Sequence, residues 1–430
     1  MDYLIVVDAR CHPVEPGVVA TESAFAAHLR LLRTRLGPRF DRLVLAAPSM
    51  SRSEFEANRA HLGSLSEKDD GIVYLPLFSD DDRIIDYWFK DARRILPALW
   101  RAVRSASIVH SGLAYDLYRP STFIAILFAI LLRRRSIFFI DIDFRNKAKM
   151  HLHNGTWSYK SYFVCRYLFD PLRRLQVWIA ARACSLCLLK SAQLVADYGR
   201  GRPNVRNFLD TAHSESHIIP PDAFERKMAF LRDPDVPLKI VFFGRFVRYK
   251  GLDQLLWAVH RAREKSGRPF EVLLIGSGDQ RPAIEALRRD LGAEDWCDLR
   301  EPISFGPALF DVLRECTLHV ATPMLEDTPR AAFDAMAAGL PVVAFDIAYY
   351  RDLRETGAVE TVPWPDKEAL ANRLVALDQD RPRLERMARR AVVAATANTQ
   401  EIWLDRRVAW TLELLDGETE PAHAALRDRS

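Results

Sequence analysis

Residues 325–346, LEDTPRAAFDAMAAGLPVVAFD, predict a loop, a helix, a tight turn and a buried strand. The pattern places Thr328 at the helix N-cap and Pro329 at the first helical position, where its missing N–H costs nothing. Gly339 and the proline two residues later end the helix. The apolar run PVVAF is typical of a parallel strand that is buried on both faces. The stretch therefore indicates a parallel sheet with helices on both sides.

Two carboxylates belong to this stretch. Glu326 lies in the loop before the helix, and Asp334 lies inside the helix among apolar residues. The free N–H groups at the start of a helix bind anions, and a buried carboxylate needs a partner. The arrangement suits a ligand that joins a sugar, a diphosphate and a ribose. The residues alone leave open an alternative in which Glu326 caps local backbone and Asp334 pairs with an arginine.

The composition is that of an ordinary globular protein, and 430 residues predict two domains of about 200 residues each. The net charge of +4 does not favour nucleic acid as a partner. Six scattered cysteines and an N-terminus without a basic region before its apolar run predict a cytoplasmic setting. The apolar run at 123–132 is about half as long as a membrane-spanning helix. Three arginines follow it, which leaves open contact with the inner face of a membrane.

Strands and helices alternate in two series, which predicts an α/β fold with two parallel sheets and a ligand cleft at their carboxyl ends. The stretch 214–237 contains four prolines and several charges, and we expect the domain boundary there. The region around Pro16 and residues 49–71 and 146–163 are expected to be loops, with some helix in the second. The expected strands are 3–7, 43–47, 72–75, 108–110, 137–142, 184–189 and 205–209, followed by 239–243, 272–275, 318–321 and 341–345.

Two glycine turns follow strands of the second series. The first, GRFVRYKG at 244–251, begins with Gly244, which lets the backbone approach a ligand closely. Arg245 and Lys250 would place two cations beside the carboxyl edge of the sheet, where they could hold a diphosphate. A solvated basic turn is the alternative, and it is favoured for Arg248. The second turn, IGSGD, contains Gly276 and is a weak signal by itself.

The motifs GRxxxxKG, LLIGSGD and E-x7-D leading into AMAAGLPVVA, in this order and at this spacing, resemble the family-4 retaining glycosyltransferases of the GT-B fold, the glycosyl transferases group 1. The resemblance covers most of residues 239–346, and in the N-terminal half it extends to the layout alone. It implies two Rossmann-like domains that face each other across a cleft. Residues 1–215 would form the acceptor-side domain and 216–399 the nucleotide-sugar domain. A helix at 400–416 would pack back on the first domain, and 417–430 would form a flexible tail.

The resemblance also implies an activity. The chain would be a hexosyl-type transferase that moves a sugar from a nucleoside-diphosphate sugar to a hydroxyl acceptor, with retention at the anomeric carbon. The acceptor would be a glycolipid, a polysaccharide or a small molecule of bacterial-type biosynthesis. No cofactor is expected beyond the nucleotide sugar, and no metal is expected to be required. A GT-B epimerase, a non-catalytic nucleotide-sugar-binding regulator or scaffold, and a membrane-binding module without chemistry remain alternatives.

The roles implied by the resemblance fall on three groups of residues. Arg245 and Lys250 would bind the donor diphosphate, Glu326 would touch the donor sugar, and Asp334 would take the ribose hydroxyls. The turn at Gly17 matches the N-terminal glycine loop of the family, which approaches the phosphates. The other residues predicted to surround the donor are Gly244, Gly276, Asp327, Thr328, Pro329, Arg330 and Ala331.

Three departures from the family pattern stand out. Asp334 is one methylene shorter than the usual Glu, and Asp327 takes the place of a usual Gly. A carboxylate at 327 is unfavourable beside a diphosphate unless Arg330 or another cation offsets it. The strand that often ends in a His in this family leads here into Asp141 and Asp143, and His110 lies one strand earlier. These last three residues are candidates for contacts with acceptor or sugar hydroxyls, and the Asp pair leaves a metal site as the alternative.

Overall fold

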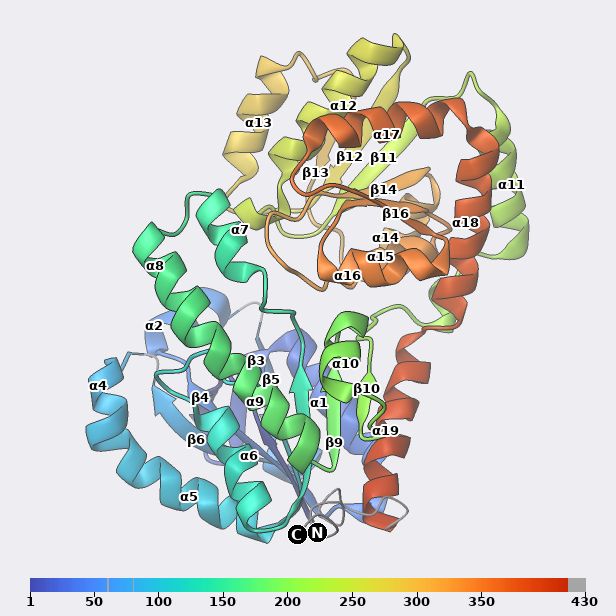
Figure 1. Ribbon diagram of the computed structural model, residues 1–430. Coiled ribbons are helices and arrows are strands. Elements are labelled where there is room, and N and C mark those ends of the chain that lie inside the picture. The colour runs from blue at the N-terminus through green and yellow to red at the C-terminus, as the bar shows by residue number, and fades with distance from the viewer. Residues whose placement is uncertain (60–61, 80, 417–430) are drawn as a thin grey trace. The chain divides into compact units, whose positions relative to one another are not determined.

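The computed structural model describes residues 1–59, 62–79 and 81–416 (Figure 1). The chain forms two compact units. Unit 1 comprises Met1–Asp141, Phe163–Phe208 and the chain from Leu404, whereas unit 2 comprises Ile142–Tyr162 and Leu209–Trp403. The stretch 146–163, which we expected to be a loop or lid, instead carries helices α7 (Lys147–His153) and α8 (Tyr159–Val164), and residues 142–162 belong to unit 2. The expected flexible tail, residues 417–430, lies outside the described residues.

Unit 1 is built on a parallel sheet of seven strands in the order β10-β9-β8-β7-β1-β4-β6. Its central strands are apolar, and Leu4, Val6 and Val109 belong to the core. All seven strands were expected from the alternating pattern. Their bounds are β1 (Asp2–Val6), β4 (Arg42–Ser49), β6 (Ile72–Ser79), β7 (Ala106–Gly112), β8 (Arg135–Ile140), β9 (Leu186–Leu189) and β10 (Val205–Asn207).

Strand order decides which helices share a face of this sheet. The chain moves in one direction from β1 to β4 and in the opposite direction from β6 through β7, β8 and β9 to β10. Right-handed crossovers therefore place α1 on one face and the later helices together on the other. Neighbouring helices of that second layer contact one another, as expected. The helices are α1 (Ser23–Leu36), and α5 (Ala92–Ser105), α6 (Ser121–Leu131), α9 (Asp170–Ala183) and α10 (Ala192–Gly199).

A small antiparallel sheet is the part of unit 1 that the sequence did not reveal. Its strands are β2 (His12–Glu15), β3 (Val18–Glu22) and β5 (Leu62–Ser66), in stretches that we expected to be loops. Gly17 lies in the tight turn between β2 and β3 with φ +78°, a conformation that favours glycine. Short helices adjoin this region and the second layer: α2 (Arg52–Asn58), α3 (Glu67–Asp70) and α4 (Ile84–Asp86).

Unit 2 contains a parallel sheet of six strands in the order β13-β12-β11-β14-β15-β16. The four central strands were expected, whereas the two edge strands were not. The two parallel α/β sheets that we predicted are therefore confirmed. The strand bounds are β11 (Leu238–Phe243), β12 (Phe270–Ile275), β13 (Cys297–Arg300), β14 (Leu318–Ala321), β15 (Val342–Phe345) and β16 (Val359–Val362).

Helices cover this second sheet and leave the loops at its carboxyl edge to form the candidate site. Helix α15 is buried on nearly every side and contacts α18, which explains its small alanine side chains. Among the described residues, we find no helix that is both long and apolar enough to cross a membrane. The helices of unit 2 are α7 (Lys147–His153), α11 (Pro221–Arg232), α12 (Leu252–Ser266), α13 (Arg281–Asp290), α14 (Pro307–Arg314), α15 (Ala331–Ala337), α16 (Ala348–Leu353), α17 (Lys367–Gln379) and α18 (Arg381–Thr396).

Candidate functional site

Three loops meet at the carboxyl edge of the six-stranded sheet, because β12, β11 and β14 are neighbours. The two glycine turns pack directly on each other. A Cβ on Gly276 would lie 1.9 Å from the backbone oxygen of Gly244, and the φ angles of these glycines are +153° and +137°. This close backbone approach explains the glycine at position 276 without any ligand.

The Lys250 turn is attached to the end of β14 by hydrogen bonds. The Thr322 hydroxyl can donate to the backbone oxygens of Lys250, at 3.1 Å, and Gly251, at 2.7 Å. Gly251 adopts a φ of +63°, and a Cβ there would lie 2.2 Å from the Thr322 backbone oxygen. These contacts fix the backbone from which the Lys250 side chain extends.

The Lys250 ammonium pairs with Asp327. Its Nζ lies 2.5 Å from Oδ2 of the carboxylate, and the two side chains are 16% and 17% exposed. Lys250 is thus the cation that offsets the unusual carboxylate. We named Arg330 or another cation for that role. Arg330 is exposed, and so is Arg245, which donates to the Tyr249 hydroxyl at 3.2 Å.

Glu326 is buried and held at both carboxylate oxygens. Asn146 Nδ2 donates to Oε1 at 3.0 Å, and the backbone N–H of Ala348 donates to Oε2 at 3.0 Å. Burial is the main cause that raises the pKa of this carboxyl group, with a further contribution from the charge of Asp143. Glu326 does cap backbone, as the alternative proposed, because Ala348 is the first residue of α16. The capped N–H lies 22 positions further along the chain.

The helix within residues 325–346 begins later than predicted. We expected Thr328 as N-cap and Pro329 at the first helical position, but α15 begins at Ala331 and its N-cap residue, Arg330, makes no side-chain cap. In the turn before the helix, the Asp327 carboxylate accepts the Thr328 N–H at 3.0 Å. Thr328, Pro329 and Ala331 are half-buried in this turn.

Asp334 is 5% exposed inside α15. Burial dominates and raises its pKa to about 7, against the opposing effects of the Arg330 charge and of a hydrogen bond from the backbone of His213. Within the described residues, its Oδ1 atom is buried without a hydrogen-bond partner. Asp334 is therefore a deeply buried acid with one unsatisfied oxygen, and the charge of Arg330 that acts on it agrees in part with the arginine-paired alternative.

The remaining predicted residues are dispersed. His110 was expected at a strand end, but β7 continues to Gly112, and His110 is a buried mid-strand residue that hydrogen-bonds Tyr3 Oη at 2.9 Å. Burial lowers its pKa to about 3. Gly17 lies in unit 1, where its backbone oxygen accepts the Glu67 N–H at 2.8 Å.

Asp141 and Asp143, the pair that left a metal site as an alternative, fall in different units. Asp141 ends the first segment of unit 1 and pairs with the buried Lys190 at 2.5 Å. Asp143 belongs to unit 2 and binds Arg145 with both oxygens. In the part of the chain that is described, no group of three or more His, Cys, Asp or Glu could hold a metal ion.

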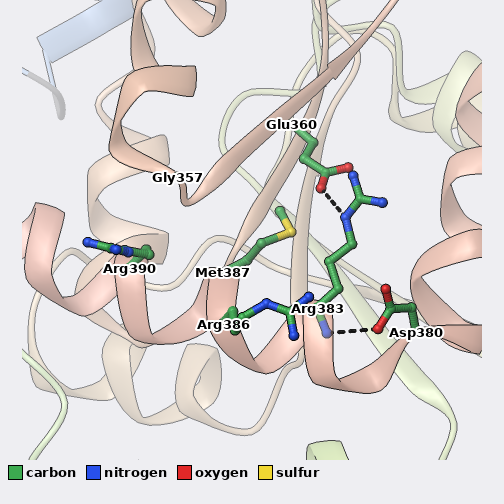
Figure 2. Close-up of a pocket in the computed structure, with 7 residues that line it drawn as sticks. All are labelled: Gly357, Glu360, Asp380, Arg383, Arg386, Met387 and Arg390. Atoms are coloured by element: carbon green, nitrogen blue, oxygen red, sulfur yellow. Dashed lines mark hydrogen bonds and ion pairs between the residues drawn. The ribbon is translucent and has the colours of Figure 1, made fainter.

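A small cavity of about 20 Å³, the size of one water molecule, adjoins the Lys250–Asp327 pair. Its lining includes Pro329, Ala331 and the buried Tyr350. A larger, open hollow of about 470 Å³ lies elsewhere on unit 2 (Figure 2). None of the predicted site residues lines it, and the residues that do are Gly357, Glu360, Asp380, Arg383, Arg386, Met387 and Arg390.

Sequence reasoning missed the residues that hold the site residues in place. Asn146, which binds Glu326, lies in a stretch without clear periodicity that we expected to be a loop. Lys190, beside Asp141, directly follows the buried strand β9, and that position at a strand end was a usable signal. His213, whose backbone hydrogen-bonds Asp334, directly precedes the predicted boundary stretch 214–237, and nothing in the sequence indicated this contact.

The segment that carries these loops matches a known family. The model for "Glycosyl transferases group 1" matches residues 237–380. D-inositol 3-phosphate glycosyltransferase of Nocardia farcinica is 30% identical over 48% of this chain and 47% of its own length. Amylovoran biosynthesis glycosyltransferase AmsK of Erwinia amylovora is 32% identical over 37% of this chain and 40% of its own length. The chain thus matches less than half the length of either relative.

Solved structures are similar over nearly the whole chain. HepE of Anabaena in complex with UDP has a TM-score of 0.59 and 16% identity, covering 96% of this chain and all of its own. WaaG, a glycosyltransferase involved in lipopolysaccharide biosynthesis, has a TM-score of 0.60 and 12% identity, covering 95% and 98%. At such identities the likeness shows the fold alone. Residues 237–380 therefore match the glycosyl transferases group 1, as the motifs predicted, in a chain with the GT-B fold.

Proposed function

We propose that this protein is a retaining, hexosyl-type glycosyltransferase that moves a sugar from a nucleoside-diphosphate sugar to a hydroxyl acceptor. The observation that carries the proposal is the joint placement of Lys250 and Glu326. The two lie on neighbouring loops at the carboxyl edge of one sheet, within the segment that matches the family. Ligands of α/β folds bind at such edges.

Arg245 and Lys250 would act on the leaving group. As the bond between the anomeric carbon and the diphosphate breaks, its electron pair moves to the diphosphate, whose negative charge two nearby cations stabilise. The acceptor oxygen bonds to the anomeric carbon, and its proton passes to the leaving phosphate. Catalysis would therefore be mainly electrostatic, which agrees with the fixed Lys250 backbone.

The two acids would hold the donor rather than react. Glu326, with each oxygen accepting one hydrogen bond, keeps lone pairs free for a sugar hydroxyl. Asp334 has an unsatisfied oxygen that could accept from a ribose hydroxyl. Gly17, Gly244 and the backbone from Thr328 to Ala331 would surround the phosphates and the sugar, while His110, Asp141 and Asp143 stay proposals for the acceptor side.

The relatives suggest the substrate class. The HepE structures contain UDP, glucose or UDP-glucose, and the names of AmsK and WaaG refer to amylovoran and lipopolysaccharide biosynthesis. We accordingly propose a nucleotide-sugar donor, a glycolipid, polysaccharide or small-molecule acceptor, and a place in bacterial-type polysaccharide or glycolipid biosynthesis. We propose that the reaction needs no further cofactor and that the protein works in the cytoplasm.

Calorimetric titration with UDP, GDP and ADP tests the proposal. We expect one nucleotide to bind, and the Arg245→Ala and Lys250→Ala variants each to lose most binding and most turnover while remaining folded. Arg248→Ala is the matched control, because this exposed arginine of the same turn should be dispensable. Near-normal turnover in both site variants would contradict the assignment.

A non-catalytic protein that binds nucleotide sugar is the second candidate. The specific observation in its favour is the Lys250–Asp327 ion pair, which occupies the cation that would meet the diphosphate. Binding of nucleotide without turnover across a panel of donors and acceptors would support this candidate. Appearance of a new glycoside would exclude it, and would exclude an epimerase as the complete description as well.

A further inference from the structure

The outward side of α9, of the π-helix before it (Cys165–Phe169) and of the end of α8 (Tyr159–Val164) is unusually apolar. Seven large apolar side chains between residues 163 and 178 are 37% to 68% exposed. A surface helix usually turns polar residues to solvent, whereas this one buries Arg173 and Gln176 and exposes leucines and aromatics. We call these residues the α9 face: Phe163, Val164, Tyr167, Leu168, Leu172, Leu175 and Trp178.

The exposed charges along this segment are all positive. Arg166 and Arg174 are exposed, and the half-buried Arg182 lies over the Trp178 ring with its guanidinium carbon 4.2 Å from the ring centre. The one acid between residues 163 and 183, Asp170, is buried and binds Arg173 Nη1 at 3.1 Å. The α9 face therefore carries positive charge without an exposed carboxylate.

The neighbouring helix extends this surface. Helix α6 lies beside α9 on the same side of the seven-stranded sheet (Figure 1). Most of its apolar run is core, as the sequence predicted, but Leu127 and Leu131 are 42% and 70% exposed. The three exposed arginines at 133–135 follow directly. Both helices thus combine exposed leucines with arginines.

This clustering is specific to unit 1. Among the described residues of unit 2, the exposed Tyr159 lies on α8, the helix that also carries Phe163, and the other exposed large apolar side chains are dispersed over separate elements: Phe230, Phe305 and Val393. Single exposed apolar residues are normal on protein surfaces, whereas a contiguous patch marks an interaction site.

We propose that the α9 face, together with Leu127 and Leu131, docks on a lipid bilayer that contains anionic headgroups. Aromatic and leucine side chains would enter the interface, and the arginines would meet lipid phosphates while their aliphatic parts cover apolar surface. The uniform positive charge of the exposed ionisable groups is complementary to the negative surface of an anionic bilayer. The inference does not depend on the proposed glycosyl transfer.

Co-sedimentation of the full chain with vesicles tests this proposal. We expect binding to phosphatidylcholine vesicles that contain about 30% phosphatidylglycerol, and weak binding to pure phosphatidylcholine. The triple variant Tyr167→Ser/Leu168→Ser/Leu172→Ser should lower the partition coefficient by about tenfold or more, because these exposed residues supply apolar insertion. Arg166→Gln/Arg174→Gln should lower it by about fivefold per arginine, with the effect reduced at high salt.

Matched controls keep the result interpretable. Phe230→Ser/Val393→Ser removes two similarly exposed apolar residues of unit 2 and should leave vesicle binding unchanged. Unchanged melting temperature and nucleotide binding in the triple variant would show that it is folded. Equal binding to neutral and anionic vesicles, or no binding to either, would overturn the proposal. A concentration-dependent dimer in sedimentation velocity that the triple variant abolishes would assign the face to a second copy instead.

Discussion

At the scale of single residues, the Lys250–Asp327 ion pair is the feature that most directly affects the proposed donor site. The pair is mostly shielded from solvent, so a diphosphate must displace or share the carboxylate. Asp327→Asn should free the ammonium and tighten binding of the cognate nucleotide by about tenfold in calorimetry. Asp295→Asn, which changes an exposed aspartate of the same unit, is the charge-matched control. Weaker binding in the Asp327 variant would show that the carboxylate organises the site instead.

The buried acid in α15 predicts a dependence of stability on pH. Burial raises the pKa of Asp334 from 3.8 to about 7, so between these values the folded protein holds a proton that the unfolded chain has released. The stabilisation that the folded protein gains from holding this proton is complete below about pH 4. It decreases as the pH rises and is lost above about pH 7. The total change amounts to at most about 4 kcal/mol.

Thermal or urea unfolding at several pH values measures this effect. Asp334→Asn should be more stable than the natural protein at pH 8 and similar to it near pH 4, because the amide cannot ionise. An identical dependence of stability on pH in the two proteins would contradict the inferred burial cost. Loss of stability at every pH would instead indicate that the amide cannot replace the carboxyl group in its hydrogen bond with His213.

The contact partners of the candidate site residues could not be predicted from the sequence. Residue types, spacing and the family resemblance nominated Lys250, Glu326 and Asp334, but each of their contacts depends on long-range packing. Asn146 is 180 positions from Glu326 in the chain, and Asp327 is 77 positions from Lys250. Local pattern also misplaced the start of α15, which begins at Ala331 without a side-chain cap at its N-cap residue.

At the scale of elements, two glycines with nearly the same backbone conformation allow two costs of adding a side chain to be measured separately. One is the cost of backbone strain, and the other is the cost of a clash with neighbouring atoms. Gly251 and Gly267 have φ angles of +63° and +65°. A Cβ on Gly267 would meet no atom within 4 Å, whereas one on Gly251 would lie 2.2 Å from the Thr322 backbone oxygen. Gly267→Ala should cost about 1 kcal/mol of unfolding free energy, and Gly251→Ala at least about 2 kcal/mol more.

Nucleotide affinity distinguishes the two variants further. Gly251→Ala must shift the turn that carries Lys250 and should weaken nucleotide binding, whereas Gly267→Ala, at the far end of α12, should not. Equal losses of stability in urea unfolding, with equal affinities, would mean that the Lys250 turn moves freely away from Thr322.

Two physical causes explain the strands that the sequence did not predict. The edge strands β13 (CDLR) and β16 (VETV) contain polar residues, because helices and neighbouring strands shield a strand at the sheet edge from water less completely than a central strand. Strands β2, β3 and β5 are short, and their stretches contain Pro13, Pro16 and Gly63, which indicate loops in a local reading. The central, fully buried strands carried continuous apolar runs and were predicted.

At the scale of the whole molecule, the C-terminal helix α19 (Gln400–Asp416) connects the two units along the chain, since unit 2 ends at Trp403 and unit 1 resumes at Leu404. Its buried residues Leu404, Val408 and Leu414 lie in the unit 1 part. Arg206 contacts both the Glu413 carboxylate and the Trp410 ring. The family resemblance implied a helix that packs back on the first domain, whereas the sequence alone predicted only its helical pattern.

Removal of the chain after Trp403 should therefore destabilise unit 1 selectively. Each of the three buried aliphatic residues contributes roughly 1.5–3 kcal/mol, and Tyr3 would also lose its hydrogen bond with Thr411. Hydrogen exchange should increase in β1 and β7 of unit 1 and stay unchanged in β11 and β12 of unit 2. Val408→Ala/Leu414→Ala in the full chain should reproduce the pattern more weakly, whereas Glu401→Gln, on the unit 2 side of the helix, should not. Faster exchange spread evenly over both sheets would mean that the two units unfold as one cooperative body, and the selective effect would then be absent.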